Sequence, residues 1–468
     1  MLFSSMVFIW IFLPVVLILN YAAQWIGGNR LANILLLIAS VLFYAWGEPV
    51  YVLLMLFSIF INWAGGMVLC RVGKGKKIVL AATVALNLLL LAYFKYAGMI
   101  VVSVNNVFGT SFSNPEVSLP IGISFFTFQA LSYVIDVYRG ECEVQKNILK
   151  LALYVSFFPQ LIAGPIVKYK DIAEQIDNRN YDNYIYVYNG IRRFSYGLGK
   201  KVLISNVLAA TVDKIYSLEA NNINWSLAWI AALMYTFQIY YDFSGYSDMA
   251  IGLGKMFGFE FRENFNYPYI SQSIREFWRR WHISLSSWFR DYVYIPLGGS
   301  RHGKWSTYRN LIIVFLLTGL WHGASWNFVL WGLFHGFFIV IERLGFSKIL
   351  DKNKAFAWLY TVALVNWGWV LFRIENIGQA LTYIEKMMLP WKYWNSSVAL
   401  FQIINGHNLF ILAVAILGAG ILQRIVPKKI KTYWKDSYLE IIFCMILMIL
   451  SIAALAGNMY NPFIYFRF

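Results

Sequence analysis

The chain has 468 residues, of which 59% are hydrophobic and 13% charged, and its formal net charge is +16. Soluble globular proteins carry about 25% charged residues, so this composition excludes an ordinary soluble domain and predicts a protein that is solvated by lipid. The positive charge is typical of the cytoplasmic loops that anchor membrane helices. We therefore expect membrane lipid, and no nucleic acid, as a partner.

Apolar segments long enough to cross a bilayer, about 20 residues, recur along the chain. They predict an all-α integral membrane protein with about eleven spans, because a backbone in lipid must satisfy its own hydrogen bonds. The predicted spans are 6–21, 31–46, 50–70, 78–100, 119–138, 225–252, 308–321, 325–342, 354–372, 409–426 and 438–457. Segments 148–165 and 268–298 are ambiguous. Because no internal repeat divides the sequence, residues 1–468 are interpreted as one membrane domain.

The distribution of basic residues predicts the orientation of the spans. The loop 71–77, "RVGKGKK", is basic, whereas 102–118 contains no Lys or Arg. The first loop is therefore expected inside and the second outside, which places the N-terminus outside. The first basic residue is Arg30, so 6–21 is expected to be a retained span and not a cleaved signal peptide.

Two segments on the predicted cytoplasmic side do not fit a simple span. The loops 139–150 and 166–201 are both basic, so the proline-containing stretch "SFFPQLIAGPI" (156–166) is expected to enter the membrane and return. The basic region 256–310 also holds an apolar patch that is too short to cross. Half-inserted backbone is tolerated where protein or water surrounds it, which favours a protein that encloses a wet cavity.

The segment 275–294, "REFWRRWHISLSSWFRDYVY", has helical periodicity and predicts one amphipathic helix along the cytoplasmic surface. One face carries Trp278, Trp281, Leu285, Trp288, Phe289 and Tyr292, and the adjacent stripe carries Arg275, Arg279, His282, Ser286 and Arg290. An aromatic anchor with lipid-phosphate contacts explains most of this pattern. Histidine adds little to such an anchor, which leaves open a stripe that faces inward and binds an anion.

The segment 240–254, "YYDFSGYSDMAIGLG", places Asp242 and Asp248 inside a predicted span. On a straight helix the two carboxylates would face different ways, and Ser244 and Gly245 are candidates for a break. Pairing with a nearby arginine or with backbone groups is the simpler alternative. No set of ligands has the spacing of a metal site, and the cysteines (Cys70, Cys142 and Cys444) show neither metal nor disulfide spacing.

The stretch "TGLWHGASW" (318–326) carries a histidine in an apolar run. His322 lies thirteen residues after Arg309, about 20 Å along a helix, and is therefore expected at or beyond the bilayer centre. Ionisable residues at that depth are functional by default, although a histidine hydrogen-bonded in the core is the alternative. His335, in "LFHGFF", is also expected within the membrane and serves as an internal comparison.

These motifs together resemble the membrane-bound O-acyltransferases, and most closely the membrane proteins of alginate and cell-wall polysaccharide O-acetylation. The resemblance is carried by "MLFSSMVFIWIFLPVV" (1–16), "LPIGISFFTFQALSYVIDVYRG" (119–140), "FFPQLIAGPIVKY" (157–169), "YDFSGYSDMAIGLGKMFGF" (241–259), "REFWRRWHISLSSWFRDYVYIPLGGSR" (275–301), "LTGLWHGASWNF" (317–328) and "WVLFR" (369–373). It implies a multi-pass protein of a bacterial cytoplasmic membrane, in which a ring of helices surrounds a central tunnel. It also implies that His322 is catalytic and that His282 is the second motif histidine.

The implied reaction is acyl transfer from a cytoplasmic thioester, expected to be acetyl-CoA, to a hydroxyl group outside. A neutral imidazole at His322 would serve as the base. Acetyl-CoA is expected as a substrate and not as a resident cofactor. The acceptor is expected to be an extracytoplasmic polysaccharide or a partner acetyltransferase protein. Donor-binding residues are expected at Arg275, Arg279, Arg290 and Trp281, with His282 at the donor entrance near the cytoplasmic surface. Tunnel-lining residues are expected at Asp242, Ser244, Asp248, Trp321, Ser325 and Asn327.

Two other functions fit parts of the sequence. One is D-alanyl transfer from a carrier protein to teichoic acid, within the same family. The other is a proton-coupled transporter or flippase, in which Asp242, Asp248 and His322 would form a proton relay. Transporters often contain paired repeats, and the absence of repeats in the sequence argues against this function.

Overall fold

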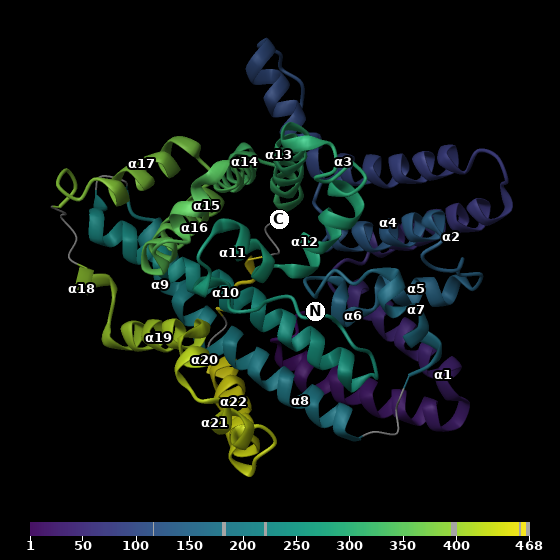
Figure 1. The fold of residues 1–468 in the computed structure, drawn as a ribbon. Coiled ribbons are helices and arrows are strands. Elements are labelled where there is room, and N and C mark those ends of the chain that lie inside the picture. The colour runs from purple at the N-terminus through teal and green to yellow at the C-terminus, as the bar shows by residue number, and fades with distance from the viewer. Residues whose placement is uncertain (116, 180–183, 220–221, 395–399, 458–459, 465–468) are drawn as a thin grey trace. The chain divides into compact units, whose positions relative to one another are not determined.

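A computed structural model describes residues 1–115, 117–179, 184–219, 222–394, 400–457 and 460–464 (Figure 1). Over these residues the protein is helical and contains no strand. Its contacts group into two compact units, residues 1–194 with 246–262 and residues 195–245 with 263–468. Helices α8 (Tyr184–Gly199) and α10 (Trp225–Met256) each have residues in both units.

The first unit contains the long apolar helices of the N-terminal part. Its elements are η1 (Phe8–Phe12), α1 (Leu13–Ala45), α2 (Tyr51–Arg71), α3 (Lys76–Phe108), α4 (Ile123–Arg139), α5 (Ile148–Ser156), α6 (Phe158–Leu161), α7 (Tyr169–Asp177), the start of α8 and the end of α10.

The second unit contains every motif that carries a histidine. Its elements before the histidine motifs are the end of α8, η2 (Lys200–Ser205), α9 (Asn206–Tyr216), the start of α10 and η4 (Pro268–Ile270). Then follow α11 (Ile274–Arg280), α12 (Ile283–Phe289), η5 (Arg290–Tyr294), α13 (Gly303–His322), α14 (Trp326–Ile341), η6 (Glu342–Phe346), α15 (Ser347–Leu350) and α16 (Lys354–Arg373). The last elements are α17 (Ile377–Met388), α18 (Leu400–Ile403), α19 (Gly406–Ile416), η7 (Leu417–Ile421), α20 (Leu422–Ile425), α21 (Lys428–Trp434) and α22 (Tyr438–Gly457).

Seven helical stretches of the described residues are long and apolar enough to cross a membrane. They are Phe8–Ala45, Tyr51–Arg71, Lys76–Phe108, Trp326–Leu350, Lys354–Arg373, Gly406–Ile425 and Tyr438–Gly457. The protein is therefore an all-α, multi-pass membrane protein. The predicted spans 6–21 and 31–46 lie in the first stretch, on either side of a break at Gly27 and Gly28, where Gly28 has a φ of 61°.

Three further predicted spans form helices that do not count among these seven. The span 119–138 corresponds to α4, which has 17 residues, most of them buried. The spans 225–252 and 308–321 correspond to α10 and α13, whose sequences include charged side chains such as Asp242 and Arg309. Most residues of α4 and α10 are buried against protein, whereas α13 has seven buried residues among its twenty.

The chain between 148 and 168 is not one continuous helix. Helix α5 ends at Ser156, Phe157 leaves the helical region with a ψ of 111°, and α6 covers only Phe158–Leu161. The backbone from Ile162 to Lys168 is buried without being helical. With nine residues, α5 is about 14 Å long and too short to cross a bilayer.

The predicted break in α10 at Ser244 and Gly245 is wrong. The helix continues for 32 residues through both positions. The glycine instead allows a close approach, because a Cβ atom at Gly245 would lie 2.7 Å from the carbonyl oxygen of Gly197. A small residue in a membrane helix is as typical of such packing as of a kink.

The hairpin of α13 and α14 places His322 at its turn. A Cβ atom at Gly319 would lie 2.3 Å from the carbonyl oxygen of Phe328, and one at Gly332 would lie 2.3 Å from that of Phe315. The two helices therefore pack backbone against backbone, which only glycine permits. Helix α13 ends at His322, and α14 begins at Trp326.

Candidate active site

His322 is enclosed by aromatic rings from three helices. It is the last residue of α13 and is 2% exposed. Its ring centroid lies 5.0 Å from that of Trp331 on α14 and 5.3 Å from that of Phe372 on α16. Trp321, its neighbour in the chain, lies 4.9 Å away. The ring is therefore held in an apolar, water-poor environment.

The predicted single helix over 275–294 is wrong, because the helix is broken at His282. Figure 1 shows α11 and α12 as two separate short helices. Trp281 is extended, and His282 has a φ of 44°, in the left-handed region that few residues other than glycine adopt. The break removes His282 from the arginine stripe and buries its side chain completely, at 0% exposure.

The break brings the two motif histidines together. The ring centroids of His282 and His322 lie 6.4 Å apart, and Trp321 lies 5.7 Å from His282. Phe243 on α10 approaches His282 edge-on at 4.7 Å. His282 thus lies beside His322 in the core and lines neither of the basic cavities described below, so the expectation that it forms the donor entrance is wrong.

His282 is held as a neutral ring. Its Nδ1 lies 3.2 Å from Oδ1 of Asn264, which is itself 1% exposed. Burial lowers the pKa of His282 to about 3, so the imidazole is uncharged at neutral pH. A neutral imidazole has a lone pair that can accept a proton, although a pKa this low makes the ring a weak base by itself.

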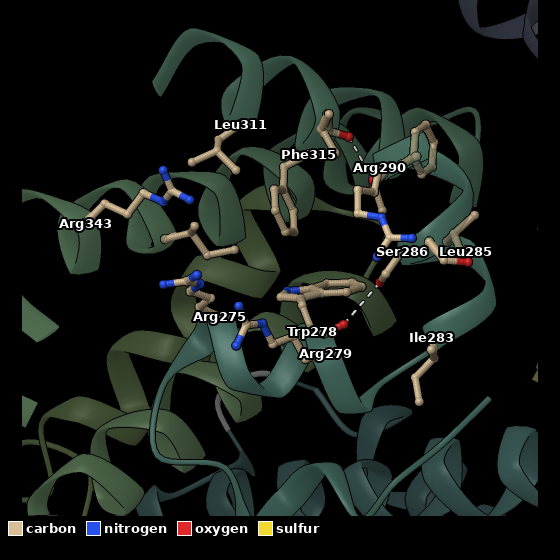
Figure 2. A pocket seen from close by; sticks show the side chains of 15 residues that line it. Arg275, Trp278, Arg279, Ile283, Leu285, Ser286, Arg290, Leu311, Phe315 and Arg343 are labelled. Carbon is tan, nitrogen blue, oxygen red and sulfur yellow. Dashed lines mark hydrogen bonds between the residues drawn. The ribbon is translucent and has the colours of Figure 1, made fainter. Parts of the chain in front are cut away.

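A cavity of about 380 Å³ opens beside the histidine elements. Figure 2 shows Arg343, Arg275 and Arg279 along one edge, and Arg290 on the other side of Trp278 and Phe315. The whole lining is Arg275, Trp278, Arg279, Ile283, Leu285, Ser286, Ser287, Phe289, Arg290, Leu311, Val314, Phe315, Thr318, Ile339 and Arg343. Since Thr318 lies one turn before His322 on α13, the apolar wall of this cavity approaches the histidine pair.

A second, more polar cavity of about 850 Å³ shares Arg275, Arg279 and Arg343 with the first. Its lining also contains Lys304 and three carboxylates, those of Glu276, Glu342 and Asp351. Within the described part of the chain, none of these three guanidinium groups forms an ion pair. Burial, together with the charges of Arg279 and Arg343, lowers the pKa of Arg275. The cluster therefore holds concentrated positive charge that an anion would stabilise.

Two other predicted donor-binding residues differ from this cluster. Arg290 lines the first cavity, but its Nε donates to Asp291 at 2.7 Å. Trp281 is 1% exposed and packs in the core, 4.8 Å from Trp369 and 5.0 Å from Phe265 between ring centroids. Trp281 lines neither cavity, because the break at His282 turns it away from the arginine stripe.

The predicted tunnel-lining carboxylates are paired with cations. In the second unit, Asp242 lies 2.5 Å from Nζ of Lys201, and both side chains are 1% exposed. In the first unit, Asp248 lies 2.7 Å from Arg193. Both observations agree with the pairing alternative. Ser244, between them in the chain, is 2% exposed.

The remaining predicted residues fix the turn after His322. Trp321 packs against His282, as described above. Ser325 donates to the side-chain oxygen of Asn327, and Asn327 donates to the carbonyl oxygen of Leu371 at 3.3 Å. These bonds attach the α13–α14 turn to α16.

Three residues of the site are not predicted by any motif in the sequence. Asn264 lies outside the histidine motifs, eleven residues before the motif that begins at Arg275. Arg343 follows an apolar span and looks like an ordinary cytoplasmic anchor. Phe372 carries no polar atom, although it lies within the "WVLFR" motif.

Phe372 also lines a third cavity, of about 70 Å³. Its lining contains Phe328 and several polar side chains, among them Asp213, Gln238 and Arg373. Arg373 pairs with Asp213 at 2.7 Å. Because Phe372 touches both His322 and this cavity, it separates the histidine pair from a polar space.

The sequence is similar to those of several known proteins. Residues 144–384 match the sequence model of the MBOAT, membrane-bound O-acyltransferase family. A probable alginate O-acetylase of Pseudomonas putida is 41% identical over 100% of both chains. A peptidoglycan O-acetyltransferase of Helicobacter pylori is 37% identical over 83% of this chain and 80% of its own. A teichoic acid D-alanyltransferase of Bacillus subtilis is 30% identical over 51% of this chain and 62% of its own. The chain therefore belongs to the membrane-bound O-acyltransferase family and is an O-acyltransferase.

Proposed function

We propose that the protein takes an acetyl group from acetyl-CoA on the cytoplasmic side of a bacterial cytoplasmic membrane and delivers it for O-acetylation of an extracytoplasmic polysaccharide. The observation that carries this proposal is the buried pair of His282 and His322 beside cavities with unpaired arginines. The names of the alginate and peptidoglycan relatives support an acetyl group and a polymer acceptor.

The arginine cluster suits the phosphates of a nucleotide thioester. Arg275, Arg279 and Arg343 line both basic cavities, and guanidinium groups bind phosphate through charge-assisted hydrogen bonds. The larger, polar cavity would hold the nucleotide. The apolar wall of the smaller cavity would direct the pantetheine arm and its thioester towards Thr318 and the histidine pair. Acetyl-CoA would bind as a substrate and leave as CoA.

The chemical step is transfer of an acetyl group from sulfur to oxygen. His322 removes the proton from the acceptor hydroxyl, and the oxygen attacks the thioester carbonyl carbon. The carbon–sulfur bond then breaks, and the imidazolium returns the proton to the thiolate of CoA. A positioned base typically accelerates such a step by roughly 10²–10⁴-fold.

The acceptor would approach through the cavity behind Phe372. Helix α16 begins after the basic stretch 342–354 and ends at Arg373, so its Arg373 end is expected outside. The acceptor hydroxyl belongs either to the polysaccharide or to a partner acetyltransferase protein. A ring of about eleven spans around a central tunnel would accommodate this route.

The two alternative functions are less well supported. A carrier protein would bring its own phosphopantetheine and would not need a nucleotide cavity, whereas two basic cavities adjoin each other here. A proton relay would need Asp242 and Asp248 to titrate freely, and each of them is held in an ion pair.

The decisive experiment is transfer of radiolabelled acetyl groups by the purified protein in liposomes. We expect CoA to be released with ester formation on added polymer when the proteins that purify with it are present. Substitution of His322 with alanine is the matched control and should abolish both. Transport of a substrate without ester formation, or transfer only from a D-alanyl carrier protein, would overturn the proposal.

A further inference from the structure

Asn264 contacts His282 from outside the motifs that carry the two histidines. It lies in the segment that precedes α11, within the same compact unit as both histidines. Its Oδ1 lies 3.2 Å from Nδ1 of His282, and both side chains are buried.

The hydrogen bonds of Ser284 fix the orientation of this amide. The backbone N–H of Ser284 points at the Asn264 side-chain atom at 3.1 Å, and the Ser284 hydroxyl donates to the same atom at 2.9 Å. A backbone N–H can only donate, so the accepting atom is the oxygen and not the amide nitrogen. This oxygen cannot donate, so Nδ1 of His282 carries the hydrogen in its contact with Asn264. The Ser284 hydroxyl also lies 3.4 Å from Nδ1, but its hydrogen is used in the shorter bond to Asn264, so it can accept from Nδ1 as well.

A second contact holds the backbone around His282. The carbonyl oxygen of Asn264 accepts the N–H of Ile283 at 2.9 Å. Asn264 thus binds His282 and the two residues that follow it, which stabilises the left-handed conformation at His282. Among the described residues, the groups that face the imidazole from other elements include Phe243 on α10, and Trp321 and His322 on α13. His322 is the titratable group among these three.

We propose that Asn264 is a positioning residue that holds His282 in the tautomer with hydrogen on Nδ1 and a basic lone pair on Nε2. This inference rests on the proposed acyl transfer and adds to it a second imidazole with a defined proton-accepting atom. A proton that enters this ring binds Nε2, while Nδ1–H stays bonded to Asn264. When this proton returns to His322, which passes it to the CoA thiolate, the His282 ring is again in the tautomer with hydrogen on Nδ1.

The test compares Asn264→Leu with Asn264→Asp. Leucine is similar in size but offers no acceptor, so the tautomer is no longer selected. We expect kcat to fall by roughly 10²-fold or more, because a histidine in the wrong tautomer costs a serine protease about 10⁴-fold. The KM for acetyl-CoA should stay within about twofold, because Asn264 lines none of the basic cavities.

Aspartate keeps the acceptor oxygen. It also removes no hydrogen bond, because the Asn264 amide nitrogen has no partner among the described residues. We expect Asn264→Asp to retain more activity than Asn264→Leu. Its carboxylate should stabilise the imidazolium, so the acid limb of its pH–rate profile should move to higher pH than in the wild type.

The matched control is Asn366→Leu. Asn366 is 1% exposed, accepts from Thr236 at 2.9 Å and donates to Val362 at 2.8 Å, without touching either histidine. The Asn366→Leu variant should have a lower thermal stability, but its folded fraction should keep the wild-type kcat. The inference is wrong if folded Asn264→Leu keeps wild-type kcat, or, should that variant not fold, if Asn264→Asp leaves the pH–rate profile unchanged. Wild-type protein that transfers no acetyl group would instead overturn the proposed function.

Discussion

The rings of His282 and His322 lie 6.4 Å apart in the core of one compact unit. Each reaches this place through a local interruption of helix. His282 follows the break between α11 and α12, and His322 ends α13 at the turn of a glycine-packed hairpin. A side chain at the end of a helix can point in a direction that a continuous helix would not allow. Both imidazoles lie at such ends, which lets them point into the same part of the core.

Replacement of His322 with alanine should abolish polymer O-acetylation while the protein stays folded in the membrane. The expected loss is roughly 10²–10⁴-fold or more in kcat, the usual effect of removing a general base. Acetyl esters on the polymer of cells that contain normal amounts of the variant provide the measurement. Near-normal acetylation would contradict the assignment of His322 as the base.

His335 provides the comparison for that variant. It is 1% exposed and packs on the same tryptophan as His322, 5.2 Å from Trp331 between ring centroids. His335→Ala should therefore lower stability by leaving a cavity, while the folded fraction keeps a kcat within about tenfold of the wild type, because no proton transfer is lost.

The histidine motifs illustrate what sequence predicts and what it does not. A histidine in an apolar run is visible because its cost in lipid is high, and His322 is indeed buried. The break at His282 is invisible, because the aromatic residues on both sides keep a helical period. Left-handed backbone at histidine has no sequence signature comparable to that of glycine. Asn264 lies eighteen residues before His282, outside the histidine motif, and no local sequence pattern links the two.

Hydropathy likewise predicts one part of the fold and not another. It located the helices that face lipid, because an apolar surface is required there. It does not distinguish a span that packs mostly against protein, such as α4 or α10, from a helix that lies inside the protein without crossing the membrane. The ion pair of Asp242 with Lys201 joins segments whose proximity no local pattern reveals.

Substitution of Arg279 with alanine should weaken the use of acetyl-CoA. Loss of a charge-assisted contact worth about 1.5–3 kcal/mol should raise KM by roughly 10–100-fold with little change in kcat, and the effect should shrink at high salt. The neighbouring Arg280 is the matched control. It lies on the same helix but binds Glu276 at 2.9 Å and lines neither basic cavity.

Initial-rate kinetics over a range of acetyl-CoA concentrations would separate these two variants. Arg280→Ala should keep the wild-type KM. Equal KM values for both variants and the wild type would mean that the arginine cluster does not bind the donor.

Removing either partner of the buried pair of Lys201 and Asp242 should unfold much of the protein. Truncation of one charge leaves the other buried and unpaired, which typically costs about 3–5 kcal/mol. Asp242 also accepts the N–H of Ile464 at 2.9 Å, and Lys201 donates to the carbonyl oxygen of Pro462. Thermal stability in detergent, followed by size-exclusion chromatography, measures the loss.

The double variant Lys201→Met with Asp242→Leu distinguishes a structural pair from a proton relay. With both charges gone, stability should recover in part, and so should acetyl transfer. A stable double variant that transfers no acetyl group would show that Asp242 has a chemical function beyond its ion pair.

The stability of the protein should depend on pH through His282, which lies outside the seven candidate spans. Burial lowers the pKa of this ring to about 3 in the folded protein, compared with about 6.5 in an unfolded chain. The unfolded state therefore binds a proton first as the pH falls. The neutral ring contributes fully to the free energy of unfolding above about pH 6.5. This contribution is lost between that value and about pH 3, at about 1.4 kcal/mol per pH unit.

Thermal unfolding at a series of pH values between 7.5 and 4.5 tests this dependence. His282→Gln is the control, because glutamine does not titrate, and every other group contributes to both curves. The difference in unfolding free energy between wild type and variant should be constant above pH 6.5 and should shrink steadily below it, as the wild type loses its advantage. A difference that stays constant down to pH 4.5 would mean that His282 binds a proton equally well in both states, as an exposed ring does, and would contradict its burial beside His322.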